Sequence, residues 1–343
     1  MPTPSTVPTP VPTPIPLPRR PRIALFSGDP AGIGPELVQK LLADPATRAK
    51  ATITLITQQA TFSPVTSPDP SSLTGGDVTL HNWPGLHAPQ FPLGVASASN
   101  GHYLMQGLDE GVKLVTQGKA DAFCFAPLNK SALRLGGMTQ EDELRWFAER
   151  LAFEGVCGEL NVLKNLWTSR VTSHVPLRDV ANLLTPGKVA DAIAMITQAL
   201  QASGVAQPRV AVCGLNPHNG DNGNFGDEED RIIAPGVQLA LERGFAADGP
   251  FPADTAFVRA FRAEGGYDGV VTMYHDQGQI AMKLMGFEHG VTVHGGLPIP
   301  ICTPAHGTAY DIAGQGIAAP TAMANAFDLA CRMGSARQPV PSP

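Results

Sequence analysis

The chain has 343 residues, of which 43% are hydrophobic and 16% are charged. This composition is typical of a globular protein with one large or two ordinary domains, and it excludes a largely disordered chain and a long coiled coil. The net charge is -6. We therefore expect no nucleic-acid partner, because such a partner requires a basic surface.

No apolar run approaches the roughly 18 residues of a membrane span, so we expect no membrane partner. The N-terminus lacks the basic-then-apolar order of a signal peptide. Five cysteines are scattered along the chain without a CxxC pair. They are predicted to be reduced, which indicates a cytoplasmic protein.

Residues 1–20 alternate proline with Thr, Val, Ile and Leu. Because proline lacks the backbone donor that helices and sheets need, this segment is predicted to be an extended, disordered tail. A partner-binding PxxP motif is the alternative. Ordered structure is expected from Arg22 onward.

Strands and helices are predicted to alternate through the rest of the chain. Strands are expected at residues 22–26, 51–57, 121–126, 161–165, 168–173, 209–213 and 267–273. Helices are expected from residue 37, at 97–117, 141–153, 179–184, 188–201 and 227–242, after Thr255, and at 320–332, whereas 58–95 reads as irregular. The alternation predicts an α/β protein with largely parallel sheets.

A glycine-rich turn follows the first predicted strand, with the sequence Ser-Gly-Asp-Pro-Ala-Gly-Ile-Gly-Pro-Glu at 27–36. Its glycine spacing differs from the GxGxxG of dinucleotide-binding loops, so a simple tight connection is the alternative. Asp29 stands at the end of the strand, and we expect it to contact substrate.

Three histidines share one context. His174, His218 and His275 each follow an apolar strand, in a turn rich in Pro, Gly, Asn or Asp. Three neutral imidazoles bind a divalent transition metal well, and Asp254 or Asp276 could complete or orient the set. The alternative is that each imidazole satisfies a loop carbonyl. The histidines outside this context are predicted to be structural: His81, His87, His102, His289 and His294.

Two lysines follow or accompany these turns. Lys130 ends the turn Pro-Leu-Asn-Lys after a strand, and Lys283 follows His275 by eight residues. Beside a metal ion, a lysine suits the oxidation of a secondary alcohol next to a carboxylate. Solvent-exposed lysines without a role are the alternative. No GxSxG motif is present, so acyl transfer has no support.

The chain resembles the family of 4-hydroxythreonine-4-phosphate dehydrogenases, metal-dependent NAD enzymes of pyridoxal phosphate biosynthesis. The resemblance lies in Gly28-Asp-Pro-Ala-Gly-Ile-Gly-Pro-Glu36, Gly214-Leu-Asn-Pro-His218, Tyr274-His-Asp-Gln-Gly278 and His306-Gly-Thr-Ala309. It covers nearly the whole chain after residue 21. Residues 306–320 also resemble the adenosine-binding run of isopropylmalate and isocitrate dehydrogenases.

The resemblance implies two α/β/α domains with a cleft between them, as in the isocitrate and isopropylmalate dehydrogenases. Residues 21–130 with 300–335 would form the first domain, and 131–299 the second, which would carry the metal-binding histidines and the interface of a homodimer with shared active sites. The implied ligands are one divalent ion (Zn, Mg, Mn or Co) on His174, His218 and His275, and NAD or NADP on His306, Gly307, Thr308, Asp311 and Gly314. Asp254, Lys130 and Lys283 would be catalytic.

The sequence departs from the family pattern where the substrate's phosphate is expected. The family's Gly-His-Thr-Glu run is absent around Glu143, its strand Asn is Thr292, and its Arg corresponds to Ile301. We expect the substrate-binding residues to be Asp29, Lys283, Glu143, Thr292 and Ile301.

We therefore predict an NAD(P)-dependent dehydrogenase that oxidises a hydroxy acid, a secondary alcohol near a carboxylate, with decarboxylation. A cis-dihydrodiol carboxylate of the terephthalate type is the alternative substrate. A non-catalytic metabolite-binding protein is the alternative of another class.

Overall fold

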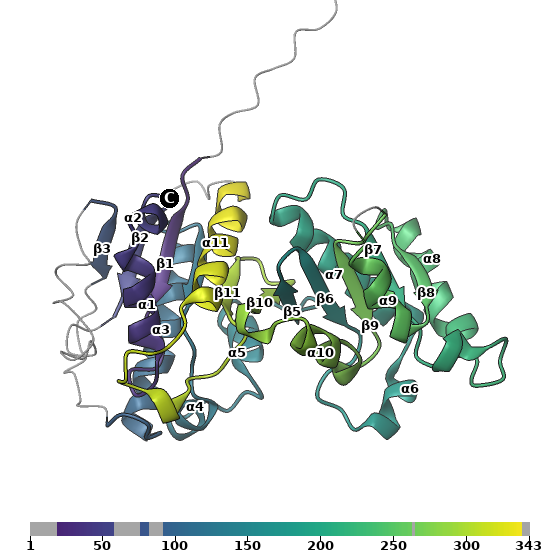
Figure 1. Cartoon of the computed structure of the whole chain (residues 1–343), viewed down its shortest axis with the longest axis horizontal. Helices are drawn as coiled ribbons and strands as arrows, with labels where there is room; N and C mark the ends of the chain where they lie inside the picture. The colour runs from purple at the N-terminus through teal and green to yellow at the C-terminus, as the bar shows by residue number, and fades with distance from the viewer. Residues whose placement is uncertain (1–18, 58–75, 82–91, 263–264, 338–343) are drawn as a thin grey trace, which may run out of the picture.

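The computed structural model describes residues 19–57, 76–81, 92–262 and 265–337. The predicted tail lies outside them except for its last two residues. A single sheet of eleven strands, in the order β3-β2-β1-β4-β11-β10-β5-β6-β9-β7-β8, runs through both halves of the molecule (Figure 1). No helix in these ranges combines the length and the apolar character that crossing a bilayer requires.

The first half contains five parallel strands with helices on both faces. The strands are β1 (Arg22–Phe26), β2 (Thr52–Ile56), β3 (Val78–His81), β4 (Ala122–Phe125) and β11 (Ile301–Pro304). The helices are α1 (Gly34–Ala43), α2 (Pro45–Arg48), α3 (Ala98–Thr116), α4 (Lys130–Leu135), α5 (Glu143–Arg150) and α11 (Thr321–Ala336).

Strand β1 reads as a continuous apolar run because both of its faces are buried. Ile23 and Leu25 belong to one core cluster, and Ala24 and Phe26 to another. Helix α3 packs closely on the second face through its glycines. A Cβ on Gly107 would lie 2.3 Å from the Phe26 ring, so a larger residue would force the helix away from the sheet.

The second half contains four parallel strands, β6 (Leu166–Arg170), β7 (Val210–Cys213), β8 (Asp248–Phe251) and β9 (Gly269–Thr272). Its α-helices are α6 (Val180–Leu183), α7 (Pro186–Ala202), α8 (Ala234–Glu242), α9 (Ala253–Ala260) and α10 (His275–Leu284). Short helical turns are η3 (Leu177–Asp179), η4 (Pro217–Gly220), η5 (Glu229–Ile233) and η6 (Phe287–His289); η7 (Tyr310–Ile312) belongs to the C-terminal return to the first half.

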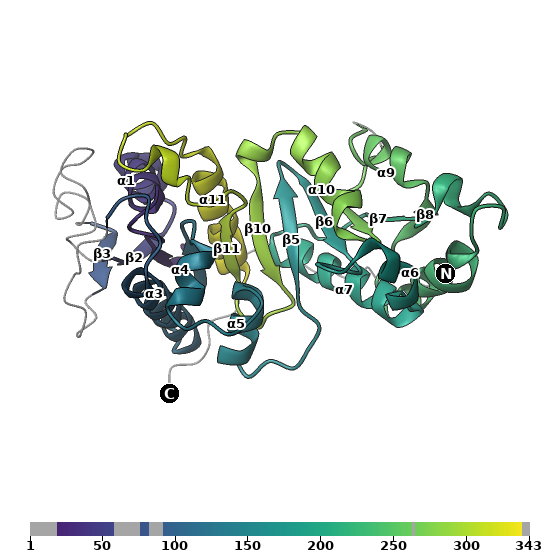
Figure 2. The ribbon, with the colours of Figure 1, turned by 90° about the horizontal axis from the view of Figure 1, so that it is seen from below.

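Two antiparallel strands join the halves. Strand β10 (Val291–Gly295) pairs with β11 on one side and with β5 (Gly158–Leu163) on the other, and β5 pairs with β6. Figure 2 shows β10 and β5 in the middle of the molecule. The sequence of β10, Val-Thr-Val-His-Gly, alternates apolar and polar residues, so one face contacts the core and the other is polar.

The predicted α/β class is confirmed, and most predicted elements are present. Several details differ, and strands β8, β10 and β11 and helices α4 and α10 were not predicted. The segment predicted as irregular contains β3, the predicted helix 227–242 is divided into the π-helical turn η5 and α8, and His275 begins α10 instead of standing in a turn. The domain boundaries, residues 130/131 and 299/300, stay a prediction.

Candidate active site

A cleft of about 500 Å³ lies between the two halves. The first half contributes the turn after β4, including Lys130, and the turn after β11, residues 306–308. The second half contributes His174, His275 and Lys283. The cleft therefore brings together side chains that are far apart in the sequence, as expected at the carboxyl ends of strands in an open α/β sheet.

The polar face of the central strands lines this cleft. Thr292 pairs with Thr303 on one side and with Asn161 on the other, and His294 pairs with Glu159. Residues paired across antiparallel strands point to the same face. All five side chains consequently line the cleft.

Two of the three predicted metal ligands lie side by side in the cleft. The ring centroids of His174 and His275 are 5.6 Å apart. The Nδ1 atom of His174 is 3.2 Å from a Glu141 oxygen, and Nδ1 of His275 is 2.7 Å from an Asp276 oxygen. Carboxylates in these positions orient imidazoles for metal binding through Nε2.

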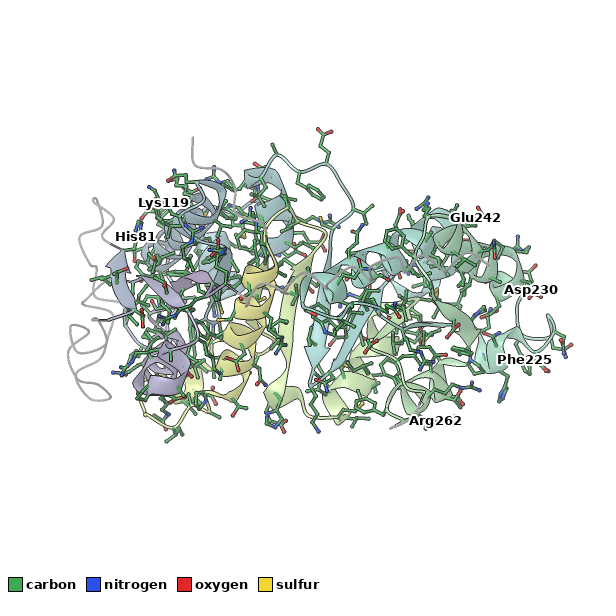
Figure 3. All side chains as sticks on the ribbon, turned by 90° about the horizontal axis from the view of Figure 1, so that it is seen from above. His81, Lys119, Phe225, Asp230, Glu242 and Arg262 are labelled. Carbon is green, nitrogen blue, oxygen red and sulfur yellow. The ribbon has the colours of Figure 1, made fainter. Side chains whose placement is uncertain are left out.

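The third predicted metal ligand, His218, lies elsewhere. It does not line the cleft, and its ring lies 6.2 Å from that of Phe225, at the end of the molecule away from the first half (Figure 3). Strands β6, β9 and β7 are parallel neighbours, so the three histidine-bearing turns do leave the same edge of the sheet. The backbone φ angles of His174 and His218 are 51° and 52°. Non-glycine residues are uncommon in this region and often mark functional sites.

Asp254 is exposed at the start of α9 and does not line the cleft. Helix α9 contacts η4, the turn that carries His218. A second set of donors, Glu141, Asp142 and His174, has ligand atoms within 4.8 Å of one another. Asp142 already has a structural contact, because its carboxylate accepts the Arg145 N–H and caps α5.

Lys130, Glu143, Glu159 and His294 form what we call the polar subsite of the cleft. Burial raises the pKa of Glu143, against the opposing effects of its own backbone N–H and of Lys130. Burial would also raise the pKa of Glu159, but the charge and hydrogen bond of Arg170 lower it overall. Burial lowers the pKa of His294 to about 4, so its ring is neutral at neutral pH.

His294 is 4% exposed, and neither of its ring nitrogens has a hydrogen-bond partner within the described residues. Leaving a buried polar group unpaired costs about 1–3 kcal/mol. Its ring stacks on Phe125 and meets the edge of Phe147. The imidazole is thus held rigidly with unused hydrogen-bonding capacity.

The predicted cofactor segment is anchored to the glycine-rich turn after β1. The Thr308 carbonyl accepts the Ile33 N–H at 3.0 Å, and a Cβ on Gly32 would lie 2.7 Å from that carbonyl oxygen. Asp311 lies in η7, and Gly314 has a φ of 77°, which favours glycine. His306, Gly307 and Thr308 reach the cleft.

Asp29 is fully buried and does not line the cleft. Its carboxylate accepts hydrogen bonds from the Ala31 N–H, the Asn100 amide and the Tyr310 hydroxyl, at 2.7–2.8 Å. Burial raises its pKa, and these bonds oppose that rise. In this structure Asp29 ties the cofactor segment to the first half.

Comparison with known families decides the affiliation of the chain. The sequence profile of the family described as "Pyridoxal phosphate biosynthetic protein PdxA" matches residues 37–330. The chain belongs to the PdxA family. The resemblance expected from the motifs is therefore confirmed.

A protein of Pseudomonas aeruginosa named "Putative 4-hydroxythreonine-4-phosphate dehydrogenase 2" is 54% identical, over 92% of this chain and 98% of the relative. The crystal structure of the 4-hydroxythreonine-4-phosphate dehydrogenase of Klebsiella pneumoniae is 33% identical, with a TM-score of 0.80 over 92% of this chain and 98% of that chain. This PdxA protein is an oxidoreductase of the kind that acts on a CH–OH group.

A third similar protein is named for a different substrate. It is a terephthalate 1,2-cis-dihydrodiol dehydrogenase from Burkholderia xenovorans LB400, whose crystal structure is 25% identical, with a TM-score of 0.65 over 89% of this chain and 96% of that chain.

Only some of the predicted substrate-binding residues line the cleft of the PdxA structure. Glu143 and Thr292 line the cleft, whereas Ile301 does not line it and is fully buried in the core of the first half. Sequence reasoning missed Glu159, Asn161, Gln279 and His294. The prediction that His294 has only a structural role did not anticipate its place in the cleft wall. The period-2 alternation of residues 291–295 was the available signal.

Proposed function

We propose that this protein is an NAD- or NADP-dependent dehydrogenase that oxidises a secondary alcohol next to a carboxylate and releases the β-keto acid product as a decarboxylated ketone. The observation that carries the proposal is the convergence in one cleft of Lys130, Lys283, the His174–His275 pair and the 306–308 segment. The PdxA affiliation supports the same reaction class.

The donor chemistry of the cleft fits a divalent metal ion. His174 and His275 would hold it, and Glu141 and Asp276 would orient their rings. When bound, such an ion polarises the alcohol and the adjacent carbonyl.

The anchored 306–316 segment fits a dinucleotide, because its backbone is fixed against the first half and its glycines leave room for close approach. Bound NAD or NADP accepts the hydride. His306, Gly307 and Thr308 would position it beside the cleft, with Asp311 and Gly314 further along the segment.

The two lysines would bind the substrate's carboxylate and accept a proton from its alcohol. An ammonium group of Lys130 or Lys283 binds a carboxylate, and in its neutral form a lysine amine takes the proton from an alcohol. We assign both to catalysis, because both line the cleft.

We further propose that His218 and Asp254 serve the cleft of a second copy in a homodimer. Both lie outside the cleft of their own chain, on elements in contact with each other. Helix α10, which begins at His275, exposes Ile280 by 60% and Leu284 by 84%. These side chains are four residues apart on one helix face, which suits an interface.

A cis-dihydrodiol carboxylate is the second candidate substrate. The similarity to the B. xenovorans dehydrogenase favours it, because that protein's name specifies an unphosphorylated diol.

The test is NADH or NADPH formation by protein loaded in turn with Zn, Mg, Mn or Co, with 4-hydroxythreonine 4-phosphate, 4-hydroxythreonine and the terephthalate dihydrodiol as substrates. We expect turnover that depends on the metal and falls at least about 100-fold in His174→Ala. The stoichiometric metal content should fall in the same variant. Binding of metal and NAD without turnover of any of these compounds would instead support a non-catalytic binding protein.

A further inference from the structure

The polar subsite has hydrogen-bonding groups that the protein itself does not satisfy. Both ring nitrogens of His294 are buried without a partner in the described part of the chain. Native structures rarely bury such groups unpaired, so the His294 ring is a candidate to bond a ligand that enters the cleft. The ring is fixed between Phe125 and Phe147 and lines the cleft.

Glu143 is the second group that lacks a side-chain partner within the described part of the chain. Its carboxylate makes no hydrogen bond or ion pair with another side chain among the described residues, although it lines the same cleft. Lys130 is the cation that acts on it. Glu143 is therefore available to accept hydrogen bonds from a ligand.

The charges of Glu159 and Arg170 offset each other, because the two side chains form an ion pair. The Arg170 guanidinium donates to Glu159 at 2.6 Å, to Asn161 at 3.0 Å and to Ser173 at 2.8 Å. Each of its three nitrogens thus already donates one hydrogen bond within the protein. The guanidinium is fixed in this orientation, whereas a free arginine can turn two parallel N–H groups towards a phosphate.

Within the subsite Lys130 stands against Glu143, and Glu159 is offset by Arg170 next to the subsite. A phosphate ester would bring up to two further negative charges next to Glu143. An ammonium group would be repelled by Lys130. A hydroxyl group fits, because it donates to the carboxylate and both donates to and accepts from a neutral imidazole.

We infer that the polar subsite binds an uncharged, hydroxyl-bearing end of the substrate and discriminates against a phosphate ester, with Glu143 and His294 as the specificity-determining residues. This inference rests on the proposed dehydrogenase function of the same cleft. It names the class of substrate as an unphosphorylated polyhydroxy acid.

A matched pair of compounds tests the inference. The kcat/KM for 4-hydroxythreonine should exceed that for its 4-phosphate by at least about tenfold in the wild type. In Glu143→Gln the advantage should shrink at least about fivefold, because the repelling charge is gone. Glu149→Gln is the matched control, because Glu149 lies on the same helix but is exposed outside the cleft, and the ratio should stay as in the wild type. A wild-type preference for the phosphate ester would overturn the inference and leave the dehydrogenase function standing.

Inorganic phosphate provides a probe that does not depend on turnover. Calorimetric titration should show no saturation below about 10 mM in the wild type and at least about fivefold tighter binding in Glu143→Gln. Micromolar binding by the wild type, or equal binding by the two proteins, would refute the subsite. If 4-hydroxythreonine, its phosphate and the terephthalate dihydrodiol are all left unoxidised, the proposed reaction fails, but this titration still decides the inference.

The role of His294 has its own signature. In His294→Leu the unpaired nitrogens are replaced by an apolar group of similar size, so thermal stability should be unchanged or higher. The kcat/KM for 4-hydroxythreonine should nevertheless fall at least about tenfold, mainly through KM. A residue with a purely structural role would show the reverse, with a lower melting temperature and unchanged kinetics.

Discussion

Buried carboxylates in this protein differ in how many donors surround them. Asp121 accepts hydrogen bonds from Arg22 and forms an ion pair with Arg19. Glu229 accepts hydrogen bonds from the backbone N–H groups of Leu215 and Asn216. Both therefore fix one part of the chain to another. The half-buried Glu143 carboxylate in the cleft has no side-chain partner among the described residues, so it connects no two parts of the chain, which is the pattern expected of a binding residue.

The acid stability of the protein should depend in part on Asp121. Burial would raise its pKa, but the bonds from Arg22 and Arg19 lower it to about 2 from a usual value of 3.8. A lowered folded-state pKa stabilises the fold fully above the unfolded pKa, and this contribution is lost as pH falls through 3.8 towards 2. At pH 7 the Asp121→Asn change should reduce the free energy of unfolding by about 2 kcal/mol.

Thermal unfolding at a series of pH values from neutral to acidic measures this contribution. The difference in Tm between wild type and Asp121→Asn should narrow as the pH approaches 2. Asp328→Asn is the control, because Asp328 forms an exposed pair with Lys50 and such pairs contribute about 0–1 kcal/mol. A difference for Asp121→Asn that is constant across the range would show that charge is not the cause.

At the scale of elements, the cofactor segment and the turn after β1 behave as one unit. Lys40 on α1 donates to the carbonyls of Gly316 and Ala318, and Glu36 accepts the Ala318 N–H. The Tyr310 hydroxyl donates to Asp29 at 2.7 Å. The glycine-rich turn is thus a support for residues 306–316.

Removal of the Tyr310 hydroxyl should loosen this unit. Tyr310→Phe removes one of the hydrogen-bond donors to the buried Asp29 carboxylate, so the free energy of unfolding should fall by about 1–3 kcal/mol. The KM for NAD should rise more than the KM for the alcohol substrate, because the segment contacts the cofactor in our proposal. Steady-state kinetics with each substrate varied in turn provides the measurement.

Tyr267→Phe is the matched control for this change. The Tyr267 hydroxyl donates to the exposed Asp248, far from the segment, so its loss should alter neither KM. Equal increases of both Michaelis constants in Tyr310→Phe would contradict a specific effect on the cofactor segment.

Elements with strong local patterns could be predicted from the sequence. The helix predicted at 97–117 is α3, Ala98–Thr116, and the strand predicted at 22–26 is β1. Strands β10 and β11 were missed because each is short and bounded by Gly or Pro. In addition, β10 is fixed by pairing with β5, which is distant in the sequence: Thr292 and its partner Asn161 are 131 residues apart. Such pairing depends on partners that no local window contains.

The same limit applies to the site. The contexts of His174, His218 and His275 were visible in the sequence, as was the parallel order that places their turns at one sheet edge. Which side chains reach the cleft depends on the paths of η4 and α10, and the sequence pattern does not specify these. Glu159 and His294 could be identified as cleft residues only from the pairing register of β5 and β10.

At the scale of the molecule, the two halves supply complementary parts of one cleft, yet His218 and Asp254 stay outside it. A homodimer that places these residues at the cleft of the partner would complete the predicted metal set. In a symmetric dimer each chain gives and receives the same residues. Neither site of the dimer would then be complete within one chain.

Mixing two inactive variants distinguishes a shared site from a self-contained one. In a dimer of His174→Ala with His218→Ala, one site would lose both ligands and the other would keep both. Random reassociation should therefore restore about a quarter of the wild-type activity. The control mixture pairs His174→Ala with His275→Ala, whose rings lie together in the cleft of one chain, so both of its sites stay damaged and no activity should return. Recovery in both mixtures, or in neither, would contradict the assignment of His218 to the partner's cleft.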